Sequence, residues 1–294
     1  MRGRGEAALS GTDRVIALGT FDGLHIAHCA VLRGANAALL FTEHPQKFLR
    51  GKAPPQLLTD EERDARMREM GLELLRISFG EIAGLAPEAF FTEILCGRFH
   101  ARGLRCGFHY RFGAQAAGGA DLLRALCDAR GVTLEVEPKI EYRGEVVSST
   151  RIRAALRDGQ ITDANTMLGR AFGYAFEVVP GDRVGRSIGI PTINQRFPEG
   201  FMVPKRGAYV SQAFVNGEWC GSVTNIGRRP SFQGGEVRSE THIIGFDGDL
   251  YGARVPVRLL DYIRPEMRFY TPEALRARIL EDVRVVTGER HANA

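Results

Sequence analysis

The sequence has little of what marks several classes of protein. It contains only five cysteines, none of them in a CxxC pair, and a single tryptophan. It has no apolar run of about 18 residues, the length needed to span a bilayer, and no long block of like charges. Residues 1–12 lack the apolar centre of a signal peptide. These absences argue against a disulfide-stapled secreted protein, a membrane-spanning chain and a charged nucleic-acid-binding tail.

What is present fits a cytoplasmic enzyme that handles anions. The 294 residues are 44% hydrophobic and 25% charged, as in ordinary globular enzymes, and the 35 glycines predict many tight turns or close approaches to a ligand. A formal net charge of +4 suits anionic small molecules without requiring nucleic acid. We therefore expect a cytoplasmic protein with no membrane and no nucleic-acid partner. A weak homo-oligomer is left open.

The first half of the chain alternates short apolar runs with helical patterns. Such alternation predicts a Rossmann-like parallel sheet with helices on both faces. The strands are expected at residues 14–19, 37–42, 72–78, 104–108 and 132–138, and the helices at 59–70, 87–96 and 121–130.

The second half changes to alternating β-formers separated by Gly, Asn and Asp turns. Two short helices are expected at 152–156 and 162–168, strands at 172–179, 208–215, 219–225, 239–246 and 255–262, and a last helix at 272–286. Asn216-Gly217 predicts a tight hairpin. The pattern indicates an all-β barrel or sandwich with a terminal helix. We expect two domains, 1–168 and 169–294.

A first group of chemical residues, 19–28, follows the first expected strand and opens a helix. Phosphates bind at this place in α/β proteins, because the helix N-terminus offers unpaired amides. His25 and His28 are three residues apart, share one helical face and could donate to phosphate oxygens. Two structural or exposed histidines are the alternative.

Two further segments accompany this group. Residues 148–153 place hydroxyls and two arginines at a helix start, where they could hold part of a triphosphate. An ordinary N-cap with surface arginines is equally open. Residues 41–45, Phe-Thr-Glu-His-Pro, are a weak signal by themselves.

A second group, residues 181–194, is a glycine-rich turn in the second half. Backbone amides in such a turn can face phosphate oxygens, and Arg186 can add charge. Thr192 and Asn194 offer oxygen ligands for Mg²⁺, which prefers a few protein oxygens together with phosphates and water. A hairpin turn at a barrel rim is the alternative explanation.

The first half resembles the nucleotidyltransferase module of the bacterial bifunctional riboflavin kinase/FAD synthetase family. Its segments 19–28, 41–45, 107–113 and 148–153 match, in order, the family's G-x-F-D-G-x-H-x-G-H, F-x-P-H-P-like, G-x-D-F-x-F-G and S-S-T-x-I-R segments. The resemblance implies transfer of AMP from ATP to FMN by direct attack of the FMN phosphate. It assigns transition-state stabilisation to His25 and His28, and nucleotide or phosphate binding to Gly19, Phe21, Asp22, Gly23, Ser149, Thr150 and Arg151.

The second half resembles riboflavin kinase. Residues 181–194 match its G-x-x-x-G-R-x-x-G-x-P-T-x-N signature, and residues 225–232, 239–243 and 263–269 match later segments in family order. The resemblance implies transfer of the ATP γ-phosphoryl group to the 5′-hydroxyl of riboflavin. It makes Glu240 the general base, Thr192 and Asn194 the Mg²⁺ ligands, and it assigns nucleotide binding to Gly185, Arg186, Gly189 and Pro191. An exposed strand carboxylate is the alternative reading of Glu240.

Three departures from the family pattern leave other functions open. Ala27 stands between the histidines where the family has glycine, His109 replaces an aspartate, and only 13 positions separate His28 from Phe41. A helix of one or two turns must bridge the first two strands. The leading hypothesis is an enzyme that makes FMN and then FAD from riboflavin and ATP. The alternatives are a riboflavin kinase with a degenerate first domain, a binding regulator, and another nucleotidyltransferase.

Overall fold

The computed structural model describes residues 13–181, 184–228 and 236–288. Two compact units make up the chain, Met1–Ser148 and Ser149–Ala294. The helices α7 (Ser149–Asp158) and α8 (Ile161–Leu168) thus group with the second unit, where α8 packs on two strands of the barrel. The division into domains 1–168 and 169–294 stays a prediction of the sequence.

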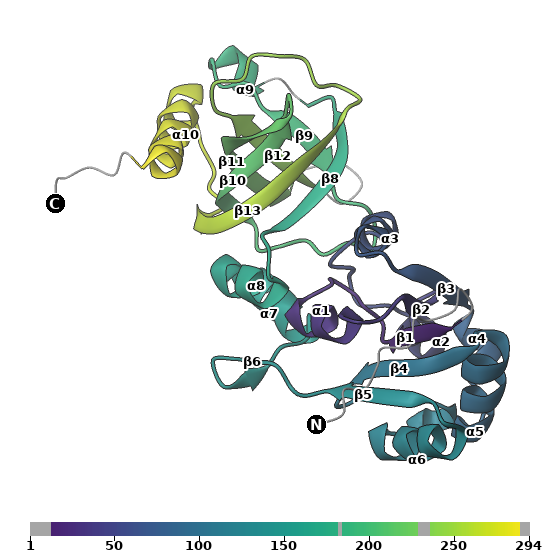
Figure 1. Cartoon of the computed structure of the whole chain (residues 1–294). Coiled ribbons are helices and arrows are strands. Elements are labelled where there is room, and N and C mark those ends of the chain that lie inside the picture. The colour runs from purple at the N-terminus through teal and green to yellow at the C-terminus, as the bar shows by residue number, and fades with distance from the viewer. Residues whose placement is uncertain (1–12, 182–183, 229–235, 289–294) are drawn as a thin grey trace, which may run out of the picture. The chain divides into compact units, whose positions relative to one another are not determined.

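The first unit is built on a five-stranded parallel sheet with the strand order β3-β2-β1-β4-β5 (Figure 1). The predicted parallel sheet is confirmed. Because β1 and β4 are parallel neighbours, the segments that follow them leave the sheet at the same edge. The chain after β1 continues to β2 and the chain after β4 continues to β5, which lie on opposite sides of this pair. The strands are β1 (Arg14–Leu18), β2 (Ala37–Phe41), β3 (Glu73–Ile77), β4 (Ala101–Gly107) and β5 (Thr133–Glu137), with a small hairpin of β6 (Glu141–Tyr142) and β7 (Glu145–Val146).

Both faces of this sheet are buried, because side chains of one strand alternate between two apolar clusters. Ile16 belongs to a cluster with Phe91, whereas Ala17 belongs to a second cluster with Val31 and Met67. The helices of this unit are α1 (Ile26–Leu32), α2 (Pro45–Arg50), α3 (Asp60–Glu69), α4 (Phe79–Ile82), α5 (Pro87–Ala89), the π-helix η1 (Phe90–Arg98), the 3-10 helix η2 (Ala114–Ala116) and α6 (Ala120–Arg130).

Helix α1 bridges β1 and β2 in seven residues, as the spacing after His28 predicts. Its residues Ala30, Val31 and Leu32 are buried, and Val31 and Leu32 pack in the apolar cluster on one face of the sheet. No helix among the residues that the structure describes is long and apolar enough to cross a membrane.

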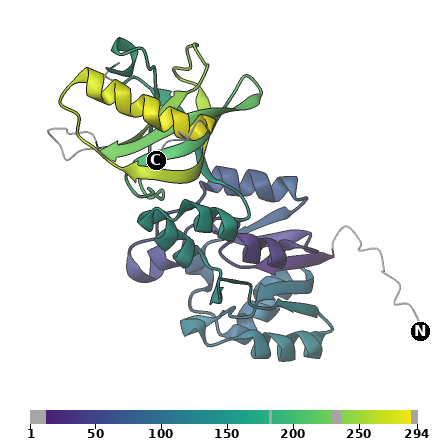
Figure 2. The same ribbon diagram turned by 90° about the vertical axis from the view of Figure 1, so that its left-hand side faces the viewer.

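The second unit is a closed antiparallel barrel with the strand order β10-β11-β12-β9-β8-β13. The sequence predicted a barrel or a sandwich, and closure decides between them. Figure 2 shows the last helix, α10, running across the outside of this barrel. The strands are β8 (Phe172–Val179), β9 (Ile193–Arg196), β10 (Gly207–Val215), β11 (Glu218–Arg228), β12 (Val237–Ile243) and β13 (Arg254–Pro265), and the helices are α9 (Val184–Ser187) and α10 (Pro272–Thr287).

Two local features fix this barrel. Asn216 and Gly217 have φ values of 52° and 86°, and they join β10 to β11 in the tight hairpin that their residue types predict. Helix α10 is held by an ion pair in which the Arg264 guanidinium donates to Asp282, with Nη2 and Oδ2 2.8 Å apart. The Asp282 carboxylate is only 1% exposed, so α10 is anchored by a buried charge pair.

Candidate active sites

The segment that leaves β1 coils tightly at the carboxyl edge of the sheet. Phe21, Gly23 and Leu24 have φ values of 53°, 85° and 42°. Two non-glycine residues in the left-handed region within four positions indicate stored backbone strain, which concentrates at functional sites. Phe21 is fully buried, so the burial of its ring in the apolar core offsets the energetic cost of this conformation.

His25 and His28 lie against each other at the start of α1. The His25 Nδ1 accepts a hydrogen bond from the His28 backbone N at 3.2 Å and so caps the helix. The two rings are stacked, with centroids 3.5 Å apart. Burial lowers the pKa of His28 well below its ordinary value, and the neighbouring His25 and His109 lower it further. The structure therefore holds a neutral His28 imidazole close to a second ring.

His109 lies near this pair because β4 is the neighbour of β1. Leu18 and Cys106 are register partners near the ends of the two strands, and His109 follows on the turn after β4. It is close enough to His28 to affect its pKa. The position where the family pattern has aspartate thus carries a third imidazole at the same edge.

Asp22 and Gly23 hold a neighbouring loop. The Asp22 Oδ1 accepts from the Leu57 backbone N at 2.9 Å, in a buried hydrogen bond. A Cβ on Gly23 would come within 2.8 Å of the Leu57 side chain, so this position requires glycine. At Gly19, a Cβ would be 3.1 Å from the Phe21 ring. These residues shape the edge of the sheet, and Asp22 and Gly23 also line a pocket there.

That pocket has about 490 Å³ of space, part of it open to solvent. Its walls come from the segments after β1 and β2 and from the start of α3: Thr20, Asp22, Gly23, Phe41, Thr42, Glu43, His44, Gln56, Leu58, Asp60 and Arg63. Hydrogen bonds from Thr42 and Ser78 lower the pKa of Glu43. Four residues of the weak sequence signal at 41–45, Phe41 to His44, therefore lie on a pocket wall.

Ser149, Thr150 and Arg151 form the first turn of α7, as the hydroxyl cluster predicts. Their role in binding phosphate stays a prediction.

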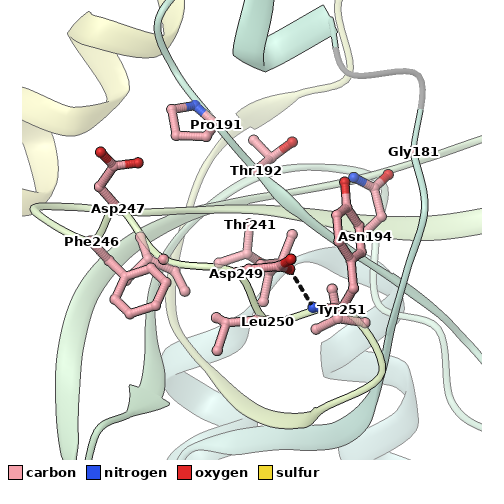
Figure 3. Close-up of a pocket in the computed structure, with 14 residues that line it drawn as sticks. Gly181, Pro191, Thr192, Asn194, Thr241, Phe246, Asp247, Asp249, Leu250 and Tyr251 are labelled. Carbon is pink, nitrogen blue, oxygen red and sulfur yellow. Dashed lines mark hydrogen bonds between the residues drawn. The ribbon is translucent and has the colours of Figure 1, made fainter.

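The second unit contains a pocket of about 700 Å³, again partly open, beside β9 (Figure 3). The figure shows Phe246 and Asp247 at the left of the view, and Asn194 and Tyr251 beside each other at the right. The wall combines apolar and polar groups: Val178, Gly181, Pro191, Thr192, Ile193, Asn194, Thr241, Ile243, Phe246, Asp247, Gly248, Asp249, Leu250 and Tyr251.

Glu240 does not line this pocket, but it stands next to one of its walls. It is paired with Asn194 on β9 and, on the other side, with Asn225 on β11. Directly opposite residues of antiparallel strands point to the same face, with Cβ atoms about 4.5–5.5 Å apart. Asn194, Glu240 and Asn225 therefore form a polar row across three strands, and Glu240 is exposed at its centre.

The backbone close to this row has glycine at positions where a Cβ would collide with neighbouring atoms. A Cβ on Gly181 would lie 2.5 Å from the Asn194 Nδ2, and one on Gly185 would lie 2.3 Å from the Ile190 carbonyl oxygen. Gly189 has a φ of 75°, a conformation that favours glycine. The side chain of Arg186 lies outside the described residues.

His242 connects β12 to the glycine-rich segment. Its Nδ1 lies 2.9 Å from the carbonyl oxygen of Pro191, so the ring donates to that oxygen. This contact holds the residues just before Thr192 against the strand that carries Glu240.

The site residues expected from the sequence did not include the loop after β12. Phe246, Asp247 and Leu250 line the pocket, and the Asp249 Oδ1 accepts from the Tyr251 N at 3.0 Å. The aromatic and acidic run that begins at the end of the predicted strand 239–246 was the available signal. None of the five cysteines forms a disulfide, and burial raises the pKa of Cys106 to about 11.

In comparisons with known proteins, the two halves of the chain match two different family models. A family model described as FAD synthetase matches residues 9–151, and one described as riboflavin kinase matches residues 168–288. Proteins described as bifunctional riboflavin kinase/FMN adenylyltransferase are similar along nearly the whole chain. The one from Listeria monocytogenes is 30% identical, covering 92% of this chain and 90% of its own. The one from Escherichia coli K12 is 32% identical, covering 91% and 90%.

A solved structure has the same fold over 95% of both chains, with a TM-score of 0.86 and 29% identity. It is described as a macrolide-efflux protein from Streptococcus pneumoniae.

Proposed function

The chain belongs to the bifunctional riboflavin kinase/FMN adenylyltransferase family, and we propose that it phosphorylates riboflavin to FMN and adenylylates FMN to FAD. The observation that carries the proposal is that each of the two units contains its own group of the residues to which the resemblance assigns chemistry. The polar row Asn194–Glu240–Asn225 lies beside the barrel pocket, and the stacked pair His25–His28 lies at the sheet edge.

In the kinase reaction, Glu240 is the general base. Its exposed carboxylate accepts the proton of the riboflavin 5′-hydroxyl as that oxygen attacks the γ-phosphorus of ATP. The bond to the β-γ bridging oxygen breaks, and ADP leaves. The pocket beside Asn194 takes the nucleotide, because Phe246, Leu250 and Tyr251 offer apolar area for a base and Thr192 offers oxygen near the phosphates.

The donor set next to the pocket fits Mg²⁺. The Thr192 hydroxyl and the Asn194 amide oxygen are hard ligands that suit this ion when ATP phosphates and water complete its shell. Within the described ranges, no group of three or more His, Cys, Asp or Glu side chains is placed to hold a metal ion. The need for glycine at 181 fits a defined position of the Asn194 amide. When bound, the ion neutralises charge that develops on the transferred phosphoryl group.

In the adenylyl transfer, an FMN phosphate oxygen attacks the α-phosphorus of ATP, and pyrophosphate leaves. His25 and His28 donate to phosphate oxygens as charge develops there. Ser149, Thr150 and Arg151 hold ATP phosphates through hydroxyl and guanidinium groups. Gly19, Phe21, Asp22 and Gly23 shape the segment that receives the nucleotide, while Gly185, Gly189 and Pro191, with Arg186, do so in the barrel.

A kinase without the second activity is not favoured, since the FAD synthetase model matches residues 9–151 in spite of Ala27 and His109. The test is to incubate the purified chain with riboflavin, ATP and Mg²⁺ and to separate the flavins by chromatography. The proposal expects FMN followed by FAD. Formation of FMN alone would leave only the kinase activity. If neither FMN nor FAD is formed, both activities are refuted.

A further inference from the structure

Gln195 is a polar side chain in the interior of the barrel. It is completely buried, and its Nε2 donates two hydrogen bonds, to the Phe176 carbonyl oxygen at 2.7 Å and to the Val255 carbonyl oxygen at 2.8 Å. Phe176 lies on β8 and Val255 on β13. One amide group therefore ties three strands together: its own strand β9, the neighbour β8 and the next strand β13.

These bonds lie next to the junction of β8 and β9, where few backbone residues are paired. The register between β8 and β9 consists of Val178 with Gln195 and Val179 with Asn194. In contrast, β8 and β13 are paired from Phe172 through Glu177. The Gln195 side chain thus supplements a short ladder, and Gln195 itself belongs to one of the two register pairs that make the ladder.

The neighbouring residue is the proposed metal ligand. Side chains alternate along a strand, so Gln195 points into the barrel while Asn194 points to the outer face, toward Gly181. The consecutive register pairs Gln195–Ser239 and Asn194–Glu240 place the interior anchor directly behind the proposed catalytic pair. Any shift of β9 at Gln195 moves Asn194 relative to Glu240. The Asn194 amide also has little room, because it packs closely on the Gly181 backbone.

We propose that Gln195 is a positioning residue of the kinase site, which fixes Asn194 against Glu240 by tying β9 to β8 and β13 from inside the barrel. The inference rests on the proposed kinase function of this site. Gln195 touches no substrate; it acts through the strand that carries Thr192 and Asn194.

The test compares Gln195→Met with Ser211→Ala in the full chain. Methionine keeps the length of the side chain and removes both donors. Ser211 is a matched control: it is also completely buried in the barrel, and its hydroxyl bonds the Ser222 carbonyl oxygen at 2.9 Å and the Thr224 hydroxyl at 2.8 Å. It lies on β10, which two strands separate from β9 in either direction around the barrel.

Two measurements report on positioning. Calorimetry gives the Kd of Mg·ADP without turnover, and steady-state kinetics give KM for Mg·ATP and kcat with riboflavin. Gln195→Met is expected to raise the Kd of Mg·ADP and to lower kinase kcat/KM about tenfold or more, as small displacements in catalytic sites do. Ser211→Ala is expected to lower the melting temperature while the Kd stays within twofold. FAD formation from supplied FMN stays unchanged in both variants.

A second substitution keeps the proposal testable if Gln195→Met does not fold. In Gln195→Glu, a buried carboxyl beside two carbonyl oxygens takes up a proton and donates one hydrogen bond. Its Mg·ADP affinity should fall between the wild type and Gln195→Met, or below the wild type if only this variant folds. Equal losses in the Gln195 and Ser211 variants, or an unchanged Kd in the Gln195 variants, would overturn the inference. A wild-type chain that forms no FMN would instead refute the kinase function itself.

Discussion

Glu240 on β12 lies directly opposite Asn194 on β9, with both side chains on the same face of the barrel wall. This pairing joins two segments that are 46 positions apart in the chain, and it places a carboxylate beside an amide oxygen at the rim of a pocket. A base for a hydroxyl and a ligand for a phosphate-bound metal must be neighbours in a kinase, because the attacking oxygen and the γ-phosphate meet between them.

Glu240→Gln should abolish FMN formation while riboflavin still binds. The amide keeps the size of the side chain and cannot accept the hydroxyl proton, so the rate should fall by about 100- to 10,000-fold. Flavin products are measured by chromatography, and riboflavin binding is measured by quenching of flavin fluorescence. FAD formation from supplied FMN is the control within the same chain. Full kinase activity in this variant would refute the base assignment.

Gly181→Ala should impair the kinase by displacing the Asn194 amide. The new methyl group would stand 2.5–2.8 Å from three atoms of that amide. Displacements of about 1 Å at a catalytic group cost on the order of 100-fold in rate. Gly221→Ala on β11 is the matched control, since the nearest atom to its Cβ, Val286 Cγ1, is 3.4 Å away. The kcat/KM for Mg·ATP is measured in both. If the two variants behave alike, Asn194 is not held by contact with Gly181.

His28→Asn should stop the reaction at FMN. The imidazole is lost from the sheet edge, whereas the barrel that carries the kinase site is untouched. The expected product from riboflavin and ATP is therefore FMN without FAD. Chromatography of the flavins over time measures this. Normal FAD formation would show that His28 is structural, which is the alternative that the sequence left open.

The pH dependence of stability should also change in that variant. The pKa of His28 is lowered in the folded chain, so below its ordinary value of 6.5 the unfolded state binds the proton more readily. Stability that His28 contributes is therefore complete above that pH and is lost as the pH falls, by up to about 1.4 kcal/mol per unit. Urea unfolding followed by far-ultraviolet circular dichroism between pH 5 and 7.5 should be less pH-dependent in His28→Asn. An identical pH dependence would contradict the buried, neutral state of the ring.

Asp282→Ala should destabilise the barrel. Removing the carboxylate leaves the Arg264 guanidinium, whose side chain is 10% exposed, without its buried partner. Breaking such a pair typically costs about 3–5 kcal/mol. The fluorescence of Trp219, the only tryptophan, reports on β11 during urea unfolding. The paired replacement Arg264→Met with Asp282→Leu should lose less stability. If it loses as much, the cost lies in packing and not in the uncompensated charge.

Much of this fold could be predicted from residue patterns. The bounds of β8 agree with the predicted strand 172–179, because its apolar and polar residues alternate. The tight turn at Asn216-Gly217 follows from residues that tolerate a positive φ. The short α1 follows from chain length alone.

Strand β9 could not be predicted in this way. Its sequence, Ile-Asn-Gln-Arg, has no apolar alternation, since Gln195, which lies on the same face as Ile193, is polar and completely buried. Only the tertiary structure supplies the two carbonyl oxygens that satisfy this amide. For the same reason the pairing of Asn194 with Glu240 could not be predicted from the sequence, although both residues were identified by resemblance. The expected helix 87–96 was recognised, but the i→i+5 bonding of η1 was not, because periodicity does not distinguish it.

If one chain transfers two different parts of ATP to flavin, ATP labelled at two positions distinguishes the two transfers. The chain is supplied with riboflavin and Mg²⁺, and with ATP labelled either at the γ-phosphate or at the α-phosphate. We expect γ-label to enter FMN and then FAD, and α-label to enter FAD alone. Failure of α-label to reach any flavin would contradict adenylyl transfer, and failure of γ-label to reach FMN would contradict the kinase.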